Sequence, residues 1–405
     1  MSFRFIDLFC GVGGFHLAME SLGGKCVMAC DIDENCRKVY QKNYGITPFA
    51  DIYQIPNNKI PMCDVLTGGF PCQAFSRAGE SEGFGDARGN LFFEILRIIK
   101  ASSPKVVLLE NVKHLMNHDS GKTWKKIKSE LVSMNGGAYD IITPDPLVLN
   151  PLFFGVPQNR ERLFILCVNK KVSQKKRNML KEYFEHARTT TLKRTNKYIN
   201  VLDAKTPPKY QITQDLGIIF DVWDDFLRIL QRNNIDIPRF PVMAEELAGK
   251  GSLQGTANCE TRLGMIKKNR EFYAKHHKII KSWLGKALRT PGFLGAKSIL
   301  EYHGKHPTPG SPILLKDCYI QLRPSGIRVS HTEYFPTLVT ITSQVPIIGK
   351  SERWMTPREC SRLQGFPANF VLHPSDGVSY KQFGNSVNVN CVKFVLTPVK
   401  KLQII

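Results

Sequence analysis

The first 170 residues alternate between short apolar runs and segments with helical spacing. Residues 3–9 and 25–31 are apolar runs of strand length, and residues 34–44 place apolar side chains three and four positions apart, as a helix does. Residues 105–110 form a β-branched run typical of a buried parallel strand. This alternation predicts an α/β fold with a doubly wound sheet and helices on both faces.

The pattern changes after Asn169, where segments become polar, basic and irregular, with frequent prolines. Organised sequence returns at Thr356-Pro357, because proline is well placed in the first turn of a helix. It continues to a strand or helix near Phe394. We therefore expect a first domain at 1–188, a smaller and irregular domain at 189–356, and a segment at 357–405 that returns to the first domain.

Composition narrows the class of protein. The 405 residues are 42% hydrophobic and 22% charged, which is ordinary for a globular protein and excludes a disordered or fibrous chain. No apolar run approaches the roughly 18 residues that span a bilayer, and the N-terminus resembles no signal peptide. The 11 cysteines include no C-x-x-C pair, which argues against structural zinc and a disulfide framework. We expect a soluble, intracellular protein that needs no metal.

The charge distribution indicates a partner. The net charge is +21, yet residues 1–110 contain 11 Lys and Arg against 12 Asp and Glu, and the rest of the chain contains 45 against 23. A basic excess confined to the later part suggests a polyanion on that side. A solvated basic face is an equally good interpretation of charge alone.

A glycine loop follows the first predicted strand, at the sheet edge where such folds bind ligands. It contains Gly11 and Gly13 but departs from the dinucleotide fingerprint, because His16 stands where the third glycine would be. Asp31, about twenty residues past the loop, suits ribose hydroxyls. Asp7 before the loop would repel a pyrophosphate and favour a sulfonium. The loop favours S-adenosylmethionine over NAD, with a tight turn that binds nothing as the alternative.

A cysteine with polar companions is predicted on the same edge. Cys72 lies on a turn fixed by Pro71 directly after a strand, where a thiolate nucleophile would be accessible. Glu110 ends another strand, and Arg160 and Arg162 precede a third. A lone cysteine there is usually a buried small hydrophobe, but the companion groups disfavour that interpretation. The absence of a nearby histidine in sequence disfavours a cysteine hydrolase.

Six motifs in this order resemble the DNA (cytosine-5)-methyltransferase family of the bacterial restriction–modification type. Together they cover both ends of the chain and leave the centre unmatched. They are DLFCGVGGF at 7–15, GFPCQAFS at 69–76, ENV at 110–112, QNRER at 158–162, RVSHTEYFPTL at 328–338 and QFGNSV at 382–387.

The resemblance implies a mechanism. A cytosine flipped out of the duplex would be attacked at carbon 6 by Cys72, which makes carbon 5 nucleophilic toward the methyl group. Glu110 would donate a hydrogen bond to ring nitrogen 3, which requires a raised pKa. Arg162, with Arg160 beside it, would bind the cytosine oxygen and hold negative charge.

The resemblance also implies binding residues. The cofactor S-adenosylmethionine would contact Asp7, Phe9, Gly11, Gly13, Asp31, Ile32, Asp51, Asn385 and Ser386, and DNA would contact Phe70, Pro71, Gln73, Ser76, Gln158, Arg328 and Thr337, with Arg160 near a phosphate. Two departures from the family pattern stand among them. At the position of Asp31 the family often has Glu, and at the position of Ile32 it often has an aromatic residue that covers the adenine. Thr397-Pro398 should stop the last helix early.

The middle domain would be the target-recognition domain. Residues 262–283 are predicted to be helical with a basic face that could contact DNA, or to pack Phe272, Ile279 and Trp283 into a core of their own. The loop at 77–90 would close over DNA, or be an ordinary surface loop. The expected partners are duplex DNA and a separate restriction endonuclease, and the enzyme is expected to be a cytoplasmic bacterial monomer.

Three alternatives stay open. One branch of the family methylates transfer RNA, although the large basic middle segment favours DNA. A DNA-binding relative without activity would be expected to lack Cys72 or Glu110, and both are present. An NAD enzyme is disfavoured by His16 and by the Cys, Glu and Arg residues on the predicted edge.

Overall fold

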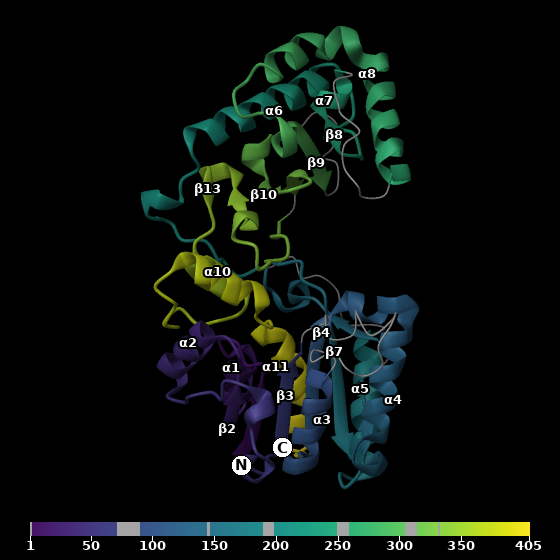
Figure 1. Cartoon of the computed structure of the whole chain (residues 1–405), viewed down its shortest axis with the longest axis vertical. Coiled ribbons are helices and arrows are strands. Elements are labelled where there is room, and N and C mark those ends of the chain that lie inside the picture. Colours follow the sequence, from purple (N-terminus) through teal and green to yellow (C-terminus); the bar gives the residue numbers. More distant parts are fainter. Residues whose placement is uncertain are drawn as a thin grey trace. The chain divides into compact units, whose positions relative to one another are not determined.

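The computed structural model describes residues 2–70, 90–143, 146–188, 198–248, 259–303, 314–330 and 333–405 (Figure 1). The chain divides into unit 1, residues 1–201 and 357–405, and unit 2, residues 202–356. The first division falls later than the expected boundary after residue 188. The reason is that residues just before it pack on unit 1: the Ile199 N–H donates to the Gly155 carbonyl at 2.9 Å, and Arg362 donates to the Val201 carbonyl at 3.1 Å.

Unit 1 contains a mixed sheet, which has seven strands among the described residues. In chain order these are β1 (Phe3–Leu8), β2 (Gly24–Cys30), β3 (Val65–Gly69), β4 (Val106–Val112), β5 (Tyr139–Ile141), β6 (Leu147–Leu149) and β7 (Arg162–Asn169). Across the sheet the order is β2-β1-β3-β4-β7-β5, and β6 also pairs with β7. The strands β2, β1, β3 and β4 are parallel neighbours, whereas β7 runs antiparallel to β4, β5 and β6.

Helices pack on both faces of this sheet. The helices of unit 1 are α1 (Gly14–Ser21), α2 (Glu34–Tyr44), α3 (Asn90–Ser102), α4 (Lys122–Gly137), α5 (Gln174–His186), α9 (Pro357–Leu363), α10 (Asp376–Asn385) and α11 (Val389–Lys401) among the described residues. Val107 and Leu109 of β4 share one core with α3 and α4. Their neighbours Val106 and Leu108 are equally buried and point to the opposite face, because side chains alternate along a strand. The contacts of α11 with α1 and α5 belong to a second helical layer (Figure 1).

One helix begins and ends where the sequence predicts, and another continues past its predicted end. The Asp33 side chain caps α2 by accepting from the backbone of Asn35 and Cys36, and α2 ends at Gly45, whose φ of 69° suits glycine. The expectation that α11 stops before Pro398 is wrong, because α11 continues to Lys401 with Pro398 buried inside it. Packing of this last turn outweighs the hydrogen bond that proline cannot donate.

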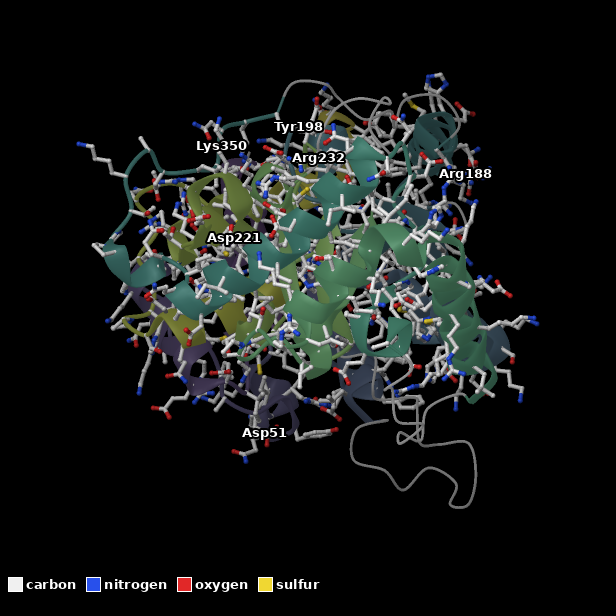
Figure 2. All side chains as sticks on the ribbon, turned by 90° about the horizontal axis from the view of Figure 1, so that it is seen from above. Asp51, Arg188, Tyr198, Asp221, Arg232 and Lys350 are labelled. Atoms are coloured by element: carbon white, nitrogen blue, oxygen red, sulfur yellow. The ribbon has the colours of Figure 1, made fainter. Side chains whose placement is uncertain are left out.

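Unit 2 has its own sheet and core. Its strands are β8 (Val242–Met243), β9 (Ile299–His303), β10 (Tyr319–Arg323), β11 (Gly326–Ser330), β12 (Ile347–Ile348) and β13 (Arg353–Trp354), in the order β13-β12-β10-β11-β9-β8. Its helices are α6 (Gln214–Arg232), α7 (Ala244–Leu247) and α8 (Cys259–Ala287). Asp221 and Arg232 lie along α6 (Figure 2). Trp223 and Phe226 of α6 pack with Trp283 of α8, which confirms the packing interpretation for that side of α8.

Among the described residues, no helix is long and apolar enough to cross a membrane.

Candidate active site

Segments of unit 1 meet at the carboxyl ends of β1, β2, β3 and β4 and line a cavity of about 470 Å³. Because the carboxyl ends of parallel strands open on one edge, residues far apart in sequence converge there. The lining residues are Phe9, Cys10, Gly11, Gly14, Phe15, Asp31, Ile32, Asp33, Cys36, Gly69, Phe70, Glu110, Asn111, Val112, Arg160, Arg162, Lys381, Gln382 and residues 384–387.

Asp31 holds the glycine loop in place. One carboxylate oxygen accepts from the Gly11 N–H at 2.7 Å, and the other accepts from the Asp33 N–H at 2.8 Å. Burial raises the pKa of Asp31, although these two hydrogen bonds oppose the shift. Phe9 has a φ of 52°, a backbone conformation that a non-glycine residue rarely adopts outside a functional turn. Asp31 therefore fixes the loop and also forms part of the cavity wall.

A buried aromatic cluster supports the loop from behind and occupies the place of the missing third glycine. His16 stacks on Tyr44 with ring centroids 3.8 Å apart, and its Nδ1 lies 2.6 Å from the Tyr40 hydroxyl. The Tyr44 hydroxyl donates to the Val12 and Gly13 carbonyls at 3.1 and 3.2 Å. A Cβ at Gly13 would stand 2.4 Å from the Tyr44 ring, so glycine is required there. Burial lowers the pKa of His16 to about 4, which keeps its ring neutral.

Three residues expected to contact the cofactor lie outside the cavity lining. Asp7 is fully buried behind the loop, where it accepts from the Thr67 hydroxyl at 3.2 Å, and burial raises its pKa well above the usual range. Asp51 accepts from the Tyr53 N–H at 3.0 Å as the cap of a short helical turn. Gly13 also lies behind the lining, against Tyr44. The expected contacts of Phe9, Gly11, Asp31, Ile32, Asn385 and Ser386 all lie on the cavity wall.

Glu110 and Arg162 form an ion pair on the cavity wall. Glu110 of β4 is opposite Phe164 of β7, so Arg162, two residues earlier on β7, lies diagonally across on the same face. Arg162 Nε lies 3.2 Å from Glu110 Oε1, and the two side chains are 17% and 12% exposed. Burial raises the pKa of Glu110, while the neighbouring arginines oppose that rise. The pair thus places a carboxyl that gains a proton readily beside a fixed positive charge.

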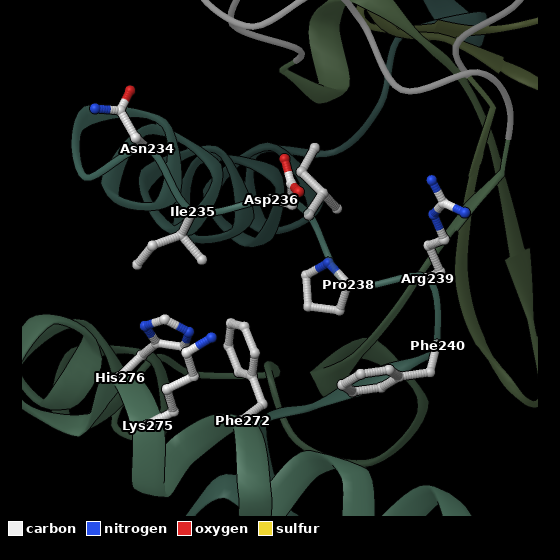
Figure 3. Close-up of a pocket in the computed structure, with 10 residues that line it drawn as sticks. Asn234, Ile235, Asp236, Pro238, Arg239, Phe240, Phe272, Lys275 and His276 are labelled. Atoms are coloured by element: carbon white, nitrogen blue, oxygen red, sulfur yellow. The ribbon is translucent and has the colours of Figure 1, made fainter.

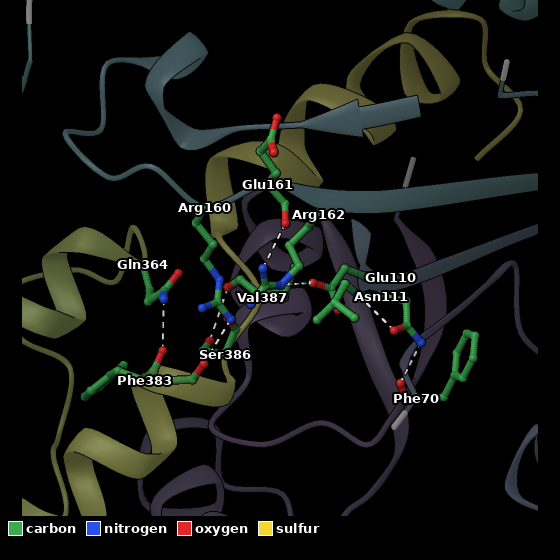
Figure 4. Close-up of polar contacts among 12 residues, drawn as sticks. Phe70, Glu110, Asn111, Arg160, Glu161, Arg162, Gln364, Phe383, Ser386 and Val387 are labelled. Carbon is green, nitrogen blue, oxygen red and sulfur yellow. Dashed lines mark hydrogen bonds and ion pairs between the residues drawn. The ribbon is translucent and has the colours of Figure 1, made fainter. Parts of the chain in front are cut away.

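Arg160, expected near a phosphate, is buried among backbone carbonyls of the C-terminal segment. It is 2% exposed, and its guanidinium donates to the Gly384 carbonyl at 3.0 Å and to the Ser386 carbonyl at 2.9 Å (Figure 4). Burial lowers its pKa to about 9. The physical reason is that carbonyls at the C-terminal end of α10 need donors, and a buried guanidinium supplies them. Arg160 ties the C-terminal segment to the end of β7.

Asn111 connects β4 to the segment before the predicted nucleophile. Its side-chain amide donates to the Phe70 carbonyl at 2.9 Å (Figure 4), and the Phe70 ring packs on Phe92 of α3. Phe70 is the last described residue before 71–89. Cys72, with Pro71, Gln73, Ser76 and the predicted closing loop at 77–90, therefore falls outside the described residues except for position 90.

The remaining predicted DNA ligands occupy different settings. Gln158 of unit 1 is fully buried, and its side-chain oxygen and nitrogen have no hydrogen-bond partner in the described part of the chain. Arg328 of unit 2 is on β11 opposite Gln321, and the Gln321 side chain donates to the Thr337 carbonyl at 3.5 Å. Arg328 and Thr337 are thus grouped within unit 2.

Sequence reasoning missed several cavity residues. Lys381 Nζ lies 3.5 Å from the Asp33 carboxylate, which links α10 to the segment before α2. Gln382 is buried on the cavity wall beside Cys36, which also lines the cavity. Gln382 begins the QFGNSV motif, so its place in that motif was the available signal.

The described residues contain no group of three or more His, Cys, Asp or Glu side chains that could hold a metal ion.

Comparison with known proteins identifies the family. A model of the family described as C-5 cytosine-specific DNA methylase matches residues 3–401. The chain is 30% identical over 393 residues to the Type II methyltransferase M.HhaI of Haemophilus parahaemolyticus, covering 97% of this chain and 92% of the relative. It is 33% identical over 395 residues to the Type II methyltransferase M.HpaII of Haemophilus parainfluenzae, covering 96% and 87%.

Solved structures confirm the expected fold class. A putative DNA modification methyltransferase encoded within a prophage of E. coli matches with a TM-score of 0.54 at 21% identity, over 99% of both chains. The Dnmt2 methyltransferase of S. pombe matches with a TM-score of 0.52 at 17% identity, over 98% of this chain and 99% of that one.

The match of the family model and of the two Type II methyltransferases over nearly the whole sequence shows that this chain belongs to the C-5 cytosine-specific DNA methylase family and methylates cytosine in DNA at carbon 5.

Proposed function

We propose that the unit 1 cavity binds S-adenosylmethionine together with a flipped-out cytosine, and that Cys72, Glu110 and Arg162 perform the transfer. The observation that carries this proposal is the Glu110–Arg162 pair, at 3.2 Å on the wall of the same cavity that the glycine loop enters. Phe70 lines that cavity as well, and Cys72 follows it by two residues.

The cavity residues fit the proposed cofactor. Phe9, Phe15 and an Ile32 that is 78% exposed offer apolar surface for a flat ring, and Asp31 offers a carboxylate for ribose hydroxyls. Gln382 adds a buried side-chain amide to the cavity wall, where it can form hydrogen bonds with a bound polar group. When bound, S-adenosylmethionine supplies the methyl group. Asn385 and Ser386, held by Arg160, would close the cavity.

The proposed chemistry follows from Glu110 and Arg162. The Cys72 thiolate bonds to carbon 6 of the cytosine, and the ring electrons move toward nitrogen 3, where protonated Glu110 donates a proton. Arg162 holds the cytosine oxygen and the charge that develops on it. Carbon 5 can then accept the methyl group. Loss of the carbon 5 proton to a base, departure of the Cys72 sulfur as a thiolate and return of the nitrogen 3 proton to Glu110 restore the aromatic ring.

Arg160 acts in this proposal as a positioning residue. Because it binds the backbone on both sides of Asn385 and lies near the Glu110–Arg162 pair, it joins the cofactor part of the cavity to the base part. Cofactor binding and catalysis would therefore share one buried support.

The names of the relatives support a restriction–modification role. M.HhaI and M.HpaII are named as Type II methyltransferases, and we propose that this chain likewise protects cellular DNA from a separate endonuclease. We further propose that unit 2 is the target-recognition domain, with Arg328 and Thr337 on its DNA side. The proposal places the enzyme in the bacterial cytoplasm as a monomer on duplex DNA.

The test is expression of the chain with a plasmid, followed by bisulfite sequencing, which reports the methylated base and its sequence context together. Cys72→Ser should abolish methylation, and Cys72→Ala should also do so while the purified protein still binds duplex DNA. Cys63→Ala, outside the cavity lining, is the matched control and should methylate as the parent does.

A second measurement addresses the bond at carbon 6. A duplex with 5-fluorocytosine at the target should trap a covalent adduct, because fluorine cannot leave as a proton. Methylation by either Cys72 variant, or an active enzyme that traps no adduct, would contradict the nucleophile assignment. Transfer RNA serves as the competing substrate, and methylation of it in preference to the plasmid would favour the RNA branch.

A further inference from the structure

The long helix α8 of unit 2 has two chemically opposite faces. Ile280, Trp283, Leu284 and Ala287 lie three and four residues apart and enter the unit 2 core. The other face is exposed and basic, with one acidic residue, Glu271, between residues 262 and 287. Its exposed cations are Lys267, Lys268, Arg270, Lys275, Lys278, Lys281 and Lys286. Packing therefore explains one side of the helix and leaves the lysine side unexplained.

Four of these lysines have no acidic partner in the part of the chain that the structure describes. Lys267 is 4.0 Å from Glu271, Arg270 is 3.7 Å from Glu246, and Lys286 is 2.8 Å from Asp225. The remaining four, Lys268, Lys275, Lys278 and Lys281, make no ion pair with a described residue. We call these four the lysine stripe.

The spacing of the lysine stripe costs the isolated helix stability. Lys275 and Lys278, and then Lys278 and Lys281, are three residues apart, and like charges at this spacing repel each other on a helix surface. An ordinary solvated face mixes both signs, as the i,i+4 pair Lys267 and Glu271 does. A polyanion along the helix would replace this repulsion with attraction.

The length of α8 matches a nucleic acid backbone. Its 29 residues extend about 43 Å at 1.5 Å per residue, and the lysine stripe covers about 20 Å of that length. Phosphates along one strand of a duplex are about 3.4 Å apart along the axis, so the stripe spans about six of them. Flexible lysine side chains suit such a row, because they act as point charges and require no fixed geometry.

A pocket extends the basic surface at its middle. It has a volume of about 500 Å³ and lies between α8 and the segment at 234–240, with Lys275 and His276 on one side and Arg239 on the other (Figure 3). Phe272 forms part of its wall, and its ring lies 4.9 Å from that of His276. Asp236 also lines the pocket. The pocket places a further cation, Arg239, near the stripe.

We propose that the lysine stripe of α8 binds backbone phosphates of duplex DNA outside the recognition sequence, without contacting base edges. The inference rests on the proposed function, because it takes duplex DNA as the substrate. In this proposal α8 increases the affinity for DNA and the rate of association with it. It does not select the target sequence, because contacts to phosphates do not distinguish one base from another. The enzyme would first bind any DNA through α8 and then search along it for its target.

The test uses the full-length protein with the four stripe lysines replaced by glutamine, K268Q/K275Q/K278Q/K281Q. The matched control is K25Q/K42Q/K59Q/K100Q, which makes the same charge change at four exposed lysines of unit 1, none of which makes an ion pair with a described residue. Fluorescence anisotropy with a 30-base-pair duplex of arbitrary sequence gives the dissociation constant between 50 and 200 mM salt. Titration with S-adenosylhomocysteine verifies that unit 1 of each protein is folded, and urea denaturation verifies that unit 2, which contains the stripe, is folded.

In the stripe variant, the slope of log K against log salt should fall in magnitude by about 2 to 4, because each phosphate that a lysine no longer neutralises lowers it by about 0.9. Its affinity should therefore drop most at 50 mM salt, and the control should change the slope by less than about 1. An equal change in both variants would overturn the proposal, because only total charge would matter. Weaker binding of single-stranded RNA of the same length, with duplex binding intact, would also overturn it.

A failure of this proposal can be distinguished from a failure of the proposed function. If the parent protein fails to methylate plasmid cytosine, the proposed function fails whatever the salt slopes show. If the parent methylates and the stripe variant keeps the parent slope, only the role of α8 is refuted.

Discussion

Unit 1 and unit 2 both pack helices on a mixed sheet, but they differ in where most of their polar side chains lie. Unit 1 buries His16, Arg160 and most of Glu110 around one cavity and connects them by hydrogen bonds or ion pairs. Unit 2 also buries a few polar side chains, such as Glu246 and Arg353, but its core is mainly aromatic and aliphatic, and most of the cations of α8 lie on its surface. The difference suggests that polar substitutions in unit 1 should alter ligand binding and chemistry, whereas substitutions in unit 2 should alter stability or electrostatic attraction.

The strongest test of this comparison is Glu110→Gln in unit 1. Glutamine keeps the shape and a hydrogen-bond donor but cannot transfer a proton, so methylation under saturating substrate should fall on the order of 10³ to 10⁴-fold. The raised pKa of Glu110 also predicts that turnover falls as pH rises through that pKa, because the protonated form is the active one. Single-turnover methylation across pH measures both effects.

The control for this prediction is binding. Titration with S-adenosylhomocysteine should give nearly the same dissociation constant for parent and Glu110→Gln. A variant that keeps more than a tenth of the parent rate, with the same pH profile, would remove Glu110 from the proposed chemistry.

In unit 2, Trp283→Ala should act on stability alone. Trp283 is 3% exposed, its ring centroid lies 4.5 Å from that of Phe226, and its Nε1 donates to the Val222 carbonyl at 2.7 Å. Loss of this side chain leaves a cavity and an unpaired carbonyl, so the free energy of unfolding of unit 2 should fall by about 3 to 5 kcal/mol. Urea denaturation measures it, with Trp283→Phe as the milder control.

The same Trp283→Ala protein should bind S-adenosylhomocysteine as the parent does at low temperature. A dissociation constant that rose together with the loss of stability would show that the two units do not divide these roles.

Asp224 is a buried carboxyl of unit 2, and it predicts a pH dependence. Burial raises its pKa to about 6, against hydrogen bonding from the Leu315 N–H at 2.6 Å. Between about pH 4 and 6, the folded state keeps a proton that the unfolded state has lost, so the stability of unit 2 should fall as pH rises through this window. With solvent screening we expect about 1 to 2 kcal/mol.

Denaturation midpoints at pH 4.5 and 6.5 check this prediction. Asp224→Asn keeps an oxygen for the Leu315 N–H and should flatten the difference between the two pH values. An unchanged difference in the variant would assign the pH dependence to another group.

The smallest expected effect is Tyr44→Phe in unit 1. It removes the hydroxyl that donates to the Val12 and Gly13 carbonyls and keeps the ring that stacks on His16. Without these hydrogen bonds the glycine loop should lose about 1 kcal/mol of stabilisation. The dissociation constant of S-adenosylhomocysteine should then rise about fivefold. Tyr139→Phe is the matched control, since its hydroxyl donates to the Pro104 carbonyl at 2.7 Å away from the cavity. Equal weakening in both variants would indicate a general loss of stability.

Much of the fold could be predicted from the sequence. The α/β class is confirmed, and the spacing of apolar residues located α2 at its observed bounds, because period and capping are local properties. The antiparallel direction of β7 could not be predicted, since an apolar strand looks the same in either direction. That direction is what brings Arg162 next to Glu110.

The sequence predicted which residues belong to the candidate site better than it predicted the surroundings of each residue. The motifs placed Glu110 and Arg162 on one edge, and these two residues do lie together. They could not show that Arg160 is buried against residues more than 220 positions later in the chain, because long-range contacts leave no local pattern. Likewise, His16 broke a glycine pattern, and only the structure shows that Tyr44 fills the space behind the loop.

The return of the chain to unit 1 after residue 356 has a consequence for biosynthesis. A ribosome releases the strands of the unit 1 sheet well before it releases α11, the helix that packs on α1 and α5. Before the segment after residue 356 has been synthesised, the apolar surface that α11 covers is exposed to solvent. The Gly384 and Ser386 carbonyls that accept hydrogen bonds from Arg160 are also absent at that stage. Nascent chains of this enzyme should therefore depend on chaperones until α11 has been synthesised, and truncation before Val389 should yield insoluble protein even though every proposed catalytic residue has been made.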